Sequence, residues 1–222
     1  MGKRQDKDAL FDALASVAKA LGNGRRAEIV DVLTQGERHV DELAAEIGQS
    51  VANTSQHLQV LLRTGLVRCR RDGARTFYAL SSISVVRLWQ SIRQVAEHHV
   101  SHLDELATAY LGDRSQLVSI CREELLERLE SGDVVVIDVR PPAEFAAGHL
   151  PGAVSIPPAE LDQRLAALPA DRQIVAYCRG TFCVYADDAV RALTTAGRDA
   201  VRMQGGYPEW AAEGLPTARR TA

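Results

Sequence analysis

The sequence predicts two domains of different fold class: a mainly α domain in the first half, and an α/β domain with a parallel sheet and helices on both faces in the second. The 222 residues are enough for two small domains. Apolar residues recur at helical spacing through the first half, whereas short β-branched runs alternate with helical segments in the second. The change falls near Leu111–Ser115, which divides the chain into residues 1–112 and 113–222.

The composition is that of an ordinary globular protein, with 46% hydrophobic and 25% charged residues. No apolar run approaches the length of a membrane span, and the opening MGKRQDKDAL lacks the apolar stretch of a secretory signal. The four cysteines are too few for a disulfide scaffold in a chain of this length: Cys69, Cys121, Cys178 and Cys183. We therefore expect a cytoplasmic protein that has no membrane partner.

The first half contains helical patterns with clear stop signals. The first pattern runs from Leu10 to Leu21 and ends at Gly22-Asn23-Gly24. The others span about 25–33, 42–47 (with Asp41 as the expected N-cap) and 52–63. Because Gly48 stops the third pattern shortly before the fourth begins, this pair is typical of a helix-turn-helix.

Two strand patterns and one long apolar stripe follow. Residues 66–71 and 75–80 flank Asp72-Gly73, which is a strong hairpin signal, and a hairpin in this place is a wing. The stripe from Val85 to Tyr110 predicts one long helix with more apolar surface than so small a domain can cover. We therefore expect a homodimer, formed through the first and last helices of this domain.

The net charge of −3 hides a basic segment. The stretch RTGLVRCRRDGAR, residues 63–75, carries five arginines against the single acid Asp72. An acidic chain with one basic strip suits a negatively charged partner met at one face, such as DNA. The alternative is a solvated charge run with no partner.

Residues 40–80, VDELAAEIGQSVANTSQHLQVLLRTGLVRCRRDGARTFYAL, resemble the ArsR family of winged-helix repressors, and the resemblance extends over about residues 8–111. It implies a dimeric winged helix-turn-helix that binds double-stranded operator DNA. The side chains expected to face inward are Ala52, Ser55, Leu58, Leu61 and Leu62. The candidates for DNA contact are Gln49, Ser50, Asn53, Thr54, Gln56 and His57 on the recognition helix, and Arg70, Arg71 and Arg75 on the wing. Asn53 and Gln56 suit base readout because amides pair with adenine, whereas wing arginines suit phosphate or the minor groove.

Members of this family often bind metals, but this sequence lacks the ligands. Where a family Cys-x-Cys pair would stand, the chain has His39 and Asp41, which removes the thiolates of a soft-metal site. A second family site, on the dimer helix, lacks its early half because residues 82–96 contain no Asp, Glu or His. Candidates for its late half are His98, His99, His102 and Glu105. We expect no metal and no cofactor.

The second half alternates strands with helices, which predicts a parallel sheet. The expected strands are 134–139, 174–177 and 200–203, and the expected helices are 123–130, 161–168 and 184–196. Three segments resemble a rhodanese domain within about residues 119–217: VVVIDVRPPAEFAAGHLPGAVSIP, IVAYCRGTFCVYADDAVRAL and VRMQGGYPEWAAEGLP. The resemblance implies that Cys178 accepts a sulfane sulfur as a persulfide.

The residues around Cys178 favour the same chemistry. Cys178 follows a buried strand, and its loop leads to a helix start at which backbone N–H groups and the helix dipole favour an anion. We therefore expect a lowered pKa at Cys178 and a nucleophilic thiolate. Arg179 is expected to add positive charge at the rim of the site. Asp138 and Arg140 are expected to be structural.

The end of this loop departs from the family pattern. Cys183 stands where a basic residue or a threonine is frequent, which weakens the expectation of efficient thiosulfate turnover. A second cysteine beside a reactive one is the layout of a redox sensor, so Cys183 is a candidate resolving cysteine; the alternative is a small residue at a helix start. The short loop matches the sulfur-transferring members rather than the related phosphatases. Cys69 and Cys121 are expected to be packing residues.

Three functions remain open at this point. The first is a repressor that senses reactive sulfur or redox state through Cys178, with or without Cys183. The second is a rhodanese-type sulfurtransferase, acting through Cys178 and Arg179, with an accessory winged helix. The third is a metal- or arsenic-responsive repressor, which would need a third thiolate or a His/carboxylate set.

Overall fold

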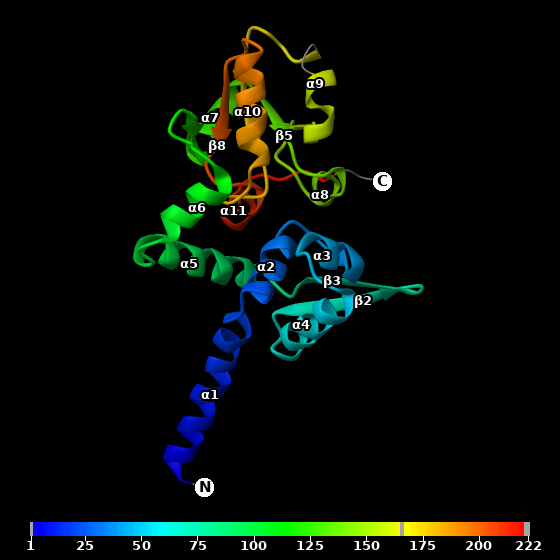
Figure 1. The fold of residues 1–222 in the computed structure, drawn as a ribbon, viewed down its shortest axis with the longest axis vertical. Coiled ribbons are helices and arrows are strands. Elements are labelled where there is room, and N and C mark those ends of the chain that lie inside the picture. Colours follow the sequence, from blue (N-terminus) through cyan, green and yellow to red (C-terminus); the bar gives the residue numbers. More distant parts are fainter. Residues whose placement is uncertain (1, 165–166, 220–222) are drawn as a thin grey trace. The chain divides into compact units, whose positions relative to one another are not determined.

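The computed structural model describes residues 2–164 and 167–219 and divides into two compact units, Met1–Ile92 and Arg93–Ala222 (Figure 1). The division falls inside one helix, α5 (Ile83–His99), so this helix begins in unit 1 and ends in unit 2. The boundary expected from the sequence lies later, after residue 112, where α6 (Leu103–Leu111) ends. Within the described residues, no helix is both long and apolar enough to cross a membrane.

Unit 1 contains a helix-turn-helix followed by a β-hairpin. Its elements before α5 are α1 (Lys3–Leu21), α2 (Gly24–Leu33), β1 (Arg38–His39), α3 (Val40–Glu46), α4 (Val51–Arg63), β2 (Val67–Asp72) and β3 (Arg75–Leu80). Strand β3 pairs antiparallel with both β1 and β2, and the β2–β3 hairpin extends from the helices as a narrow ribbon (Figure 1). Gly73 adopts φ +59° in the hairpin turn, a conformation that glycine allows. The predicted wing is confirmed.

One apolar core holds unit 1 together. Ile29 of α2, Leu43 of α3 and Leu58 of α4 are fully buried in one cluster, as their helical spacing predicted. The beginning of α5 belongs to the same unit, because Trp89 Nε1 donates a hydrogen bond to Asp31 Oδ1 at 2.6 Å. The winged helix-turn-helix fold is therefore confirmed.

The cap of the first helix of the helix-turn-helix differs from the prediction. His39, not Asp41, is the N-cap of α3: its side chain accepts a hydrogen bond from the Asp41 backbone N–H at 3.3 Å. Glu42 completes a reciprocal cap, since its Oε2 accepts from the His39 N–H at 2.9 Å. The helix consequently begins earlier than the expected Glu42.

The inward face of α4 also differs from the prediction. Ala52 is exposed, whereas Thr54 is fully buried and donates from Oγ1 to Ser50 O at 3.0 Å. Because α4 begins at Val51, directly after the Ser50 N-cap, its buried positions are Thr54, Leu58 and Leu61. Ala52 was therefore wrongly placed in the core, and Thr54 wrongly placed on the surface.

Unit 2 contains a five-stranded sheet. Its elements after α5 are α6, β4 (Ser119–Ile120), α7 (Arg122–Ser131), β5 (Val134–Asp138), α8 (Pro142–Ala147), β6 (Val154–Ser155), the 3-10 turn η1 (Pro158–Glu160), α9 (Leu161–Arg164), β7 (Gln173–Tyr177), α10 (Tyr185–Thr195), β8 (Ala200–Met203) and α11 (Tyr207–Ala212). The strand order is β4-β8-β7-β5-β6, and every neighbouring pair is parallel. The predicted parallel sheet is confirmed.

Helices cover both faces of this sheet. Ile174 of β7 lies in one buried cluster with Leu193 of α10. Its neighbour Val175 lies in a second cluster with Leu125 of α7 and Trp210 of α11. Because successive side chains of a strand point to opposite faces, α10 covers one face, and α7 and α11 cover the other.

Two helices predicted from apolar periodicity have different bounds. The stripe from Val85 to Tyr110 forms two helices, α5 and α6, separated by residues 100–102. The break was missed because this stretch contains neither glycine nor proline, the usual helix-ending signals. The helix predicted over 161–168 appears as α9, which ends at Arg164; residues 165–166 lie outside the described residues.

Candidate functional site

Cys178 directly follows β7, and the loop after it ends at Cys183, just before α10. The Cys178 side chain is 2% exposed and packs in the cluster under α10. Its Sγ lies 3.7 Å from Cys183 O and 3.9 Å from Gly180 O, so either carbonyl is within reach of the single S–H. Cys183 is half-buried, and both cysteines are free thiols. The structure thus brings the two cysteines of the predicted loop into one site.

Glycines allow this loop to pack against the turn between β8 and α11. Gly180 has φ +145°, which other residues rarely adopt. A Cβ on Gly206 would collide with the backbone of Cys178 and Gly180. This close approach lets the Tyr207 N–H donate to Cys178 O at 3.1 Å. Gly206 was not predicted to support the loop, although the Gly-Gly pair at 205–206 was a signal for it.

The two thiols titrate as a pair. Burial raises the pKa of Cys178 well above its ordinary value, and hydrogen bonding to Cys183 adds to this shift. The same hydrogen bond is the largest cause that lowers the pKa of Cys183 to about 7. Backbone hydrogen bonds at Gly180 and Ala186 favour the Cys178 thiolate, as expected, but burial outweighs them. The expectation of a lowered pKa at Cys178 is therefore wrong: the pKa is raised at Cys178 and lowered at Cys183.

Arg179 is part of the loop, and its charge is paired with a carboxylate. Its Nε is 2.9 Å from Glu144 Oε1 and 3.1 Å from Oε2, and its Nη2 is 2.6 Å from Oε1. Glu144, in α8, is fully buried and needs such a partner. Arg179 still lowers the pKa of Cys183 through its charge. Its main structural effect is to join the loop to α8, and its catalytic role stays a prediction.

Asp138 and Arg140 form a fully buried ion pair beneath the site. Arg140 Nη2 lies 2.6 Å from Asp138 Oδ2 and also 2.6 Å from Gly148 O, and Tyr177 Oη donates to Asp138 Oδ2 at 2.5 Å. Tyr177 immediately precedes Cys178, so this cluster fixes the end of β7. The contacts of the pair join β5 to Gly148 and to the last residue of β7, in keeping with a structural function.

Two more charged residues, Arg114 and Asp187, lie next to the loop: Arg114 donates to its carbonyls and pairs with Asp187. Neither was predicted from the sequence. Asp187 lies in the first turn of α10, is fully buried and pairs with Arg114. Its signal was available, because it falls on the apolar face of α10, three positions before the buried Val190. Arg114 follows α6 in a segment without any motif, so nothing in the sequence marked it.

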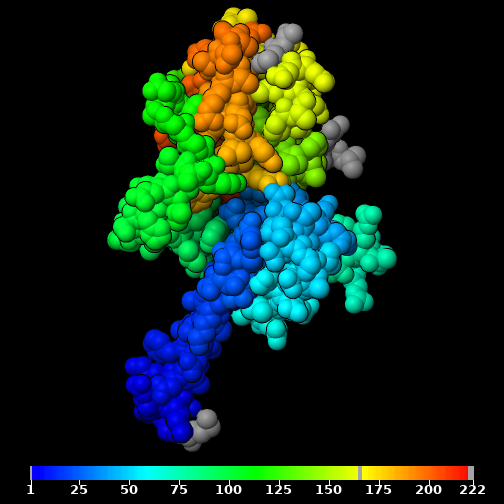
Figure 2. Space-filling model, in the orientation of Figure 1, coloured from blue at the N-terminus to red at the C-terminus, as the bar shows by residue number. Residues whose placement is uncertain are grey.

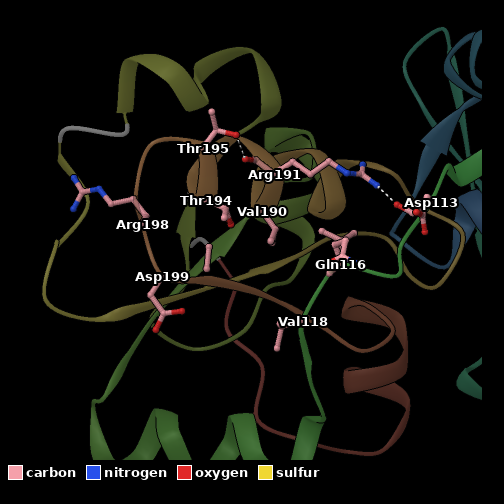
Figure 3. Close-up of a pocket in the computed structure, with 11 residues that line it drawn as sticks. Asp113, Gln116, Val118, Val190, Arg191, Thr194, Thr195, Arg198 and Asp199 are labelled. Carbon is pink, nitrogen blue, oxygen red and sulfur yellow. Dashed lines mark hydrogen bonds between the residues drawn. The ribbon is translucent and has the colours of Figure 1, made fainter.

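A pocket of about 630 Å³ opens elsewhere in unit 2, between the segment after α6 and the C-terminal half of α10 (Figure 3). Leu117, Val118 and Val190 form its apolar wall, and Thr194 and Arg191 are among its polar residues. Its lining contains no residue of the Cys178–Cys183 loop, so this pocket is separate from the cysteine pair. Across residues 2–164 and 167–219, no three His, Cys, Asp or Glu side chains gather as metal ligands do.

In unit 1, the start of α4 presents most of the polar residues predicted to contact DNA. Ser50 caps the helix, accepting a hydrogen bond on Oγ from the Asn53 N–H at 3.2 Å. Ser50, Asn53 and Gln56 are exposed, and Gln49 and His57 are half-buried. Thr54 is buried and was wrongly counted among the candidates, since its hydroxyl is turned to the helix backbone.

The wing arginines are not equivalent. Arg70 pairs with Glu37, with Nε 2.8 Å from Oε2, and its guanidinium lies 4.7 Å from the centre of the Phe77 ring. Arg71 and Arg75 are exposed, and no ion pair of theirs is recorded within the described part of the chain. Cys69, expected to pack, is instead exposed on β2. Phosphate would therefore meet Arg71 and Arg75 directly but would compete with a carboxylate for Arg70.

The coupling of the two thiols predicts an ordered reaction with iodoacetamide, which alkylates thiolates. We expect Cys183 to react before the buried Cys178, at a rate that rises with pH about a midpoint near pH 7. The variant Cys178→Ala removes the hydrogen-bond donor, so the midpoint should rise toward the ordinary cysteine value of about 8.5. Peptide mass spectrometry over a pH series separates both sites from the exposed Cys69, and Cys121→Ala is the matched control. An unchanged midpoint in Cys178→Ala would contradict the coupling.

Comparison with known proteins supplies the family. Residues 23–68 match the family described as bacterial regulatory protein, arsR family, and residues 122–213 match the rhodanese-like domain. The HTH-type transcriptional regulator Rv0324 of Mycobacterium tuberculosis is 46% identical over 215 residues, covering 97% of this chain and 94% of that protein. A sulfurtransferase of Allochromatium vinosum is 37% identical over 95 residues, covering 42% of this chain and 88% of that protein.

A solved structure from Mycobacterium bovis, described as a homodimeric winged helix-turn-helix DNA-binding domain, is 42% identical, with a TM-score of 0.41. The match covers 46% of this chain and 93% of the M. bovis domain. The relative from M. tuberculosis is matched over nearly the full length of both chains. This chain therefore belongs to the ArsR family of transcriptional regulators and carries a rhodanese-like domain at its C-terminal end.

Proposed function

We propose that this protein is a homodimeric, DNA-binding repressor whose affinity for its operator is set by the sulfur or redox state of Cys178 and Cys183. The observation that carries the proposal is the coupled thiol pair, with Cys178 Sγ 3.7 Å from Cys183 O, in the same chain as an ArsR-family helix-turn-helix. A reactive thiol next to a second cysteine is the usual arrangement of a reversible sensor. The identity of the relative as a transcriptional regulator agrees with this function.

The chemistry can be written as two exchange steps. A thiolate of the pair attacks the terminal sulfur of a polysulfide, so that one cysteine S–S bond forms, one polysulfide S–S bond breaks, and a polysulfide anion shorter by one sulfur leaves. The other cysteine, as thiolate, then attacks the cysteine sulfur of this persulfide and expels hydrosulfide. The net result is a Cys178–Cys183 disulfide: two thiols are oxidised and one sulfane sulfur is reduced. Because the pKa of Cys183 is lowered to about 7, this residue is partly ionised to a thiolate at neutral pH.

Operator recognition is proposed for the start of α4 and for the wing. Asn53 and Gln56 are exposed and polar near the helix N-terminus, the part of a recognition helix that enters the major groove. Arg71 and Arg75 on the hairpin carry the charge that holds DNA phosphates. A helix-turn-helix dimer reads two half-sites, so dimerisation is part of this function.

The dimer is supported by an uncovered apolar face on α1. Leu10, Phe11 and Leu14 are 58%, 58% and 62% exposed in the single chain. Figure 2 shows the N-terminal half of α1, in dark blue, with no other part of unit 1 covering it on that face. Large apolar side chains on one helix face are stabilised by burial against a partner. We assign that partner to a second copy of the chain, with α5 contributing its own exposed Val95.

A rhodanese-type sulfurtransferase is the second candidate. The specific observation in its favour is the 37% identity with the sulfurtransferase of A. vinosum. Such an enzyme would transfer sulfur from thiosulfate to cyanide repeatedly, whereas a sensor has to keep its modification long enough to change DNA binding. The sulfur-loading experiment below distinguishes the two.

Base readout by α4 predicts different effects at neighbouring positions. We expect Gln56→Ala to weaken binding to the selected operator by about 10-fold, the equivalent of ~1.4 kcal/mol and within the range of one lost base contact. The control Thr54→Ser keeps the buried hydroxyl and should change affinity less than about twofold. Fluorescence anisotropy with a duplex selected by the reduced wild-type chain from a random library measures both. Equal losses of operator affinity in the two variants would contradict the assignment of Gln56 as a base-contacting residue.

The dimer assignment predicts that charge on the α1 face separates the subunits. Leu14→Asp should sediment as a monomer at concentrations at which the wild type is a dimer, because a buried unpaired carboxylate is costly. Val118→Asp is the matched control, since Val118 is equally exposed but lies in unit 2. It should remain dimeric. A dimeric Leu14→Asp protein would place the interface elsewhere.

The main test compares operator affinity before and after polysulfide treatment, with the intact mass recorded each time. We expect the wild type to gain sulfur mass or lose the mass of two hydrogen atoms, and to bind the selected operator at least 10-fold more weakly. Cys178→Ser should bind DNA normally when untreated and should not respond. Cys69→Ser, which changes a cysteine outside the site, is the control and should respond like the wild type.

The opposite results are equally informative. A wild-type chain that gains sulfur with no change in operator affinity would contradict the sensor, and sustained thiosulfate:cyanide turnover would then identify the enzyme. A response retained in Cys178→Ser would exclude Cys178 as the sensing residue.

A further inference from the structure

Arg114, a residue outside the Cys178–Cys183 loop, donates hydrogen bonds to two carbonyls of this loop. Its Nη1 donates to Thr181 O at 2.8 Å and its Nη2 to Cys183 O at 3.1 Å. Its Nε donates to Asp187 Oδ2 in the first turn of α10. One guanidinium thus joins two carbonyls of the loop to the helix that follows, a geometry to which the planar fork of arginine is suited.

The ion pair between Arg114 and Asp187 is largely buried, which strengthens it. Asp187 is fully buried, and the Arg114 side chain is 20% exposed. The other oxygen of Asp187 faces Arg202 Nε at 3.4 Å, but among the described residues neither of these two atoms has a hydrogen-bond partner. Arg114 therefore supplies the direct hydrogen bond that the buried carboxylate needs, and removing it would leave a poorly compensated charge.

The backbone on both sides of Arg114 is fixed as well. Asp113 O accepts a hydrogen bond from Arg191 Nη2 at 2.9 Å, the contact drawn at the edge of the pocket in Figure 3. Asp113 Oδ1 also accepts one from the Ser115 N–H at 2.8 Å, and Leu117 packs against the cluster under α10. The segment that leaves α6 is consequently held against α10 at consecutive residues, with Arg114 as the one that reaches the loop.

We propose that Arg114 is the positioning residue of the Cys178–Cys183 loop and that it ties the state of this loop to the segment leading out of α6. The inference builds on the proposed function, since it names the residue through which the cysteine pair would act on the rest of the chain.

The chemistry of the pair takes place at this contact. Cys183 O accepts a hydrogen bond from Arg114 Nη2 and lies 3.7 Å from Cys178 Sγ in the reduced state. A disulfide removes the thiol proton and requires a Cβ–Cβ separation of about 3.5–4.5 Å with a defined dihedral angle. Oxidation therefore changes the surroundings of the Cys183 carbonyl. Because Arg114 is bound to that carbonyl and to a buried carboxylate, any movement of the Cys183 peptide reaches the segment after α6 directly.

The test uses the full-length chain and the variant Arg114→Gln, with two readouts. The first is the midpoint pH of Cys183 alkylation. It should lie above that of the wild type, because the variant loses the hydrogen bonds that position the loop and a positive charge near it. The second is the ratio of operator dissociation constants after and before polysulfide treatment. We expect this ratio to fall from at least 10 in the wild type to about 1 in Arg114→Gln, which should still gain sulfur.

Arg191→Gln is the matched control, because it releases the neighbouring Asp113 carbonyl without touching the loop. It should keep the wild-type midpoint and the wild-type response. If Arg114→Gln does not fold, Arg114→Lys takes its place: the ammonium keeps a charge beside Asp187 but cannot hold the carboxylate and both carbonyls at once. It should show the same two changes at smaller size.

The outcomes separate the two levels of the argument. A variant that folds, takes up sulfur, keeps the wild-type midpoint and still responds on DNA overturns the role of Arg114. If the wild type itself takes up sulfur without a DNA response, the proposed sensor fails, and Arg114 is then judged by the alkylation midpoint alone. A shifted midpoint supports its positioning role, and an unchanged midpoint overturns it.

Discussion

The backbone carbonyls of the partly buried Cys178–Cys183 loop need hydrogen-bond donors, and this requirement organises unit 2. The stretch from Cys178 to Cys183 belongs to no strand or helix, so few of its carbonyls are satisfied by regular pairing. Tyr207 N donates to the first carbonyl of the loop, and Arg114 donates to two near its end. The turn after β8 and the segment after α6, far apart in the sequence, therefore meet at the same six residues.

The charges around this loop are arranged in pairs. Each of three buried carboxylates has its own arginine: Asp138 with Arg140, Glu144 with Arg179, and Asp187 with Arg114. Breaking such a pair by removing one partner is strongly destabilising, so the pairs hold α8, β5 and α10 in register with the loop. Because these charges balance locally, burial and mutual hydrogen bonding have the largest effects on the ionisation of the two thiols. That is why the pKa is raised at the deeper Cys178 and lowered at Cys183.

The DNA-binding half depends on a simpler constraint: the residue at which α4 begins decides which of its side chains face the core. Ser50 caps α4 and fixes its first residue as Val51, and this decides which side chains face the core. Thr54 turns inward in line with Leu58 and Leu61, leaving Asn53 and Gln56 on the surface. The predicted set of DNA-contacting residues stays a prediction, and the position of the cap decides which of its members are exposed. The same reliance on periodicity hid the break between α5 and α6, because the apolar spacing continues across it.

The sequence by itself determined the two fold classes, the positions of most long helices and strands, and the loop with its two cysteines. These features depend on local periodicity, turn residues and motifs, which are properties of neighbouring residues in the chain. Only the tertiary structure decided the protonation of the thiols, the pairing of Arg179 with Glu144 and of Arg70 with Glu37, and the grip of Arg114 on the loop. Burial and ion pairing depend on residues that are distant in the sequence and adjacent in space, so no local pattern contains them.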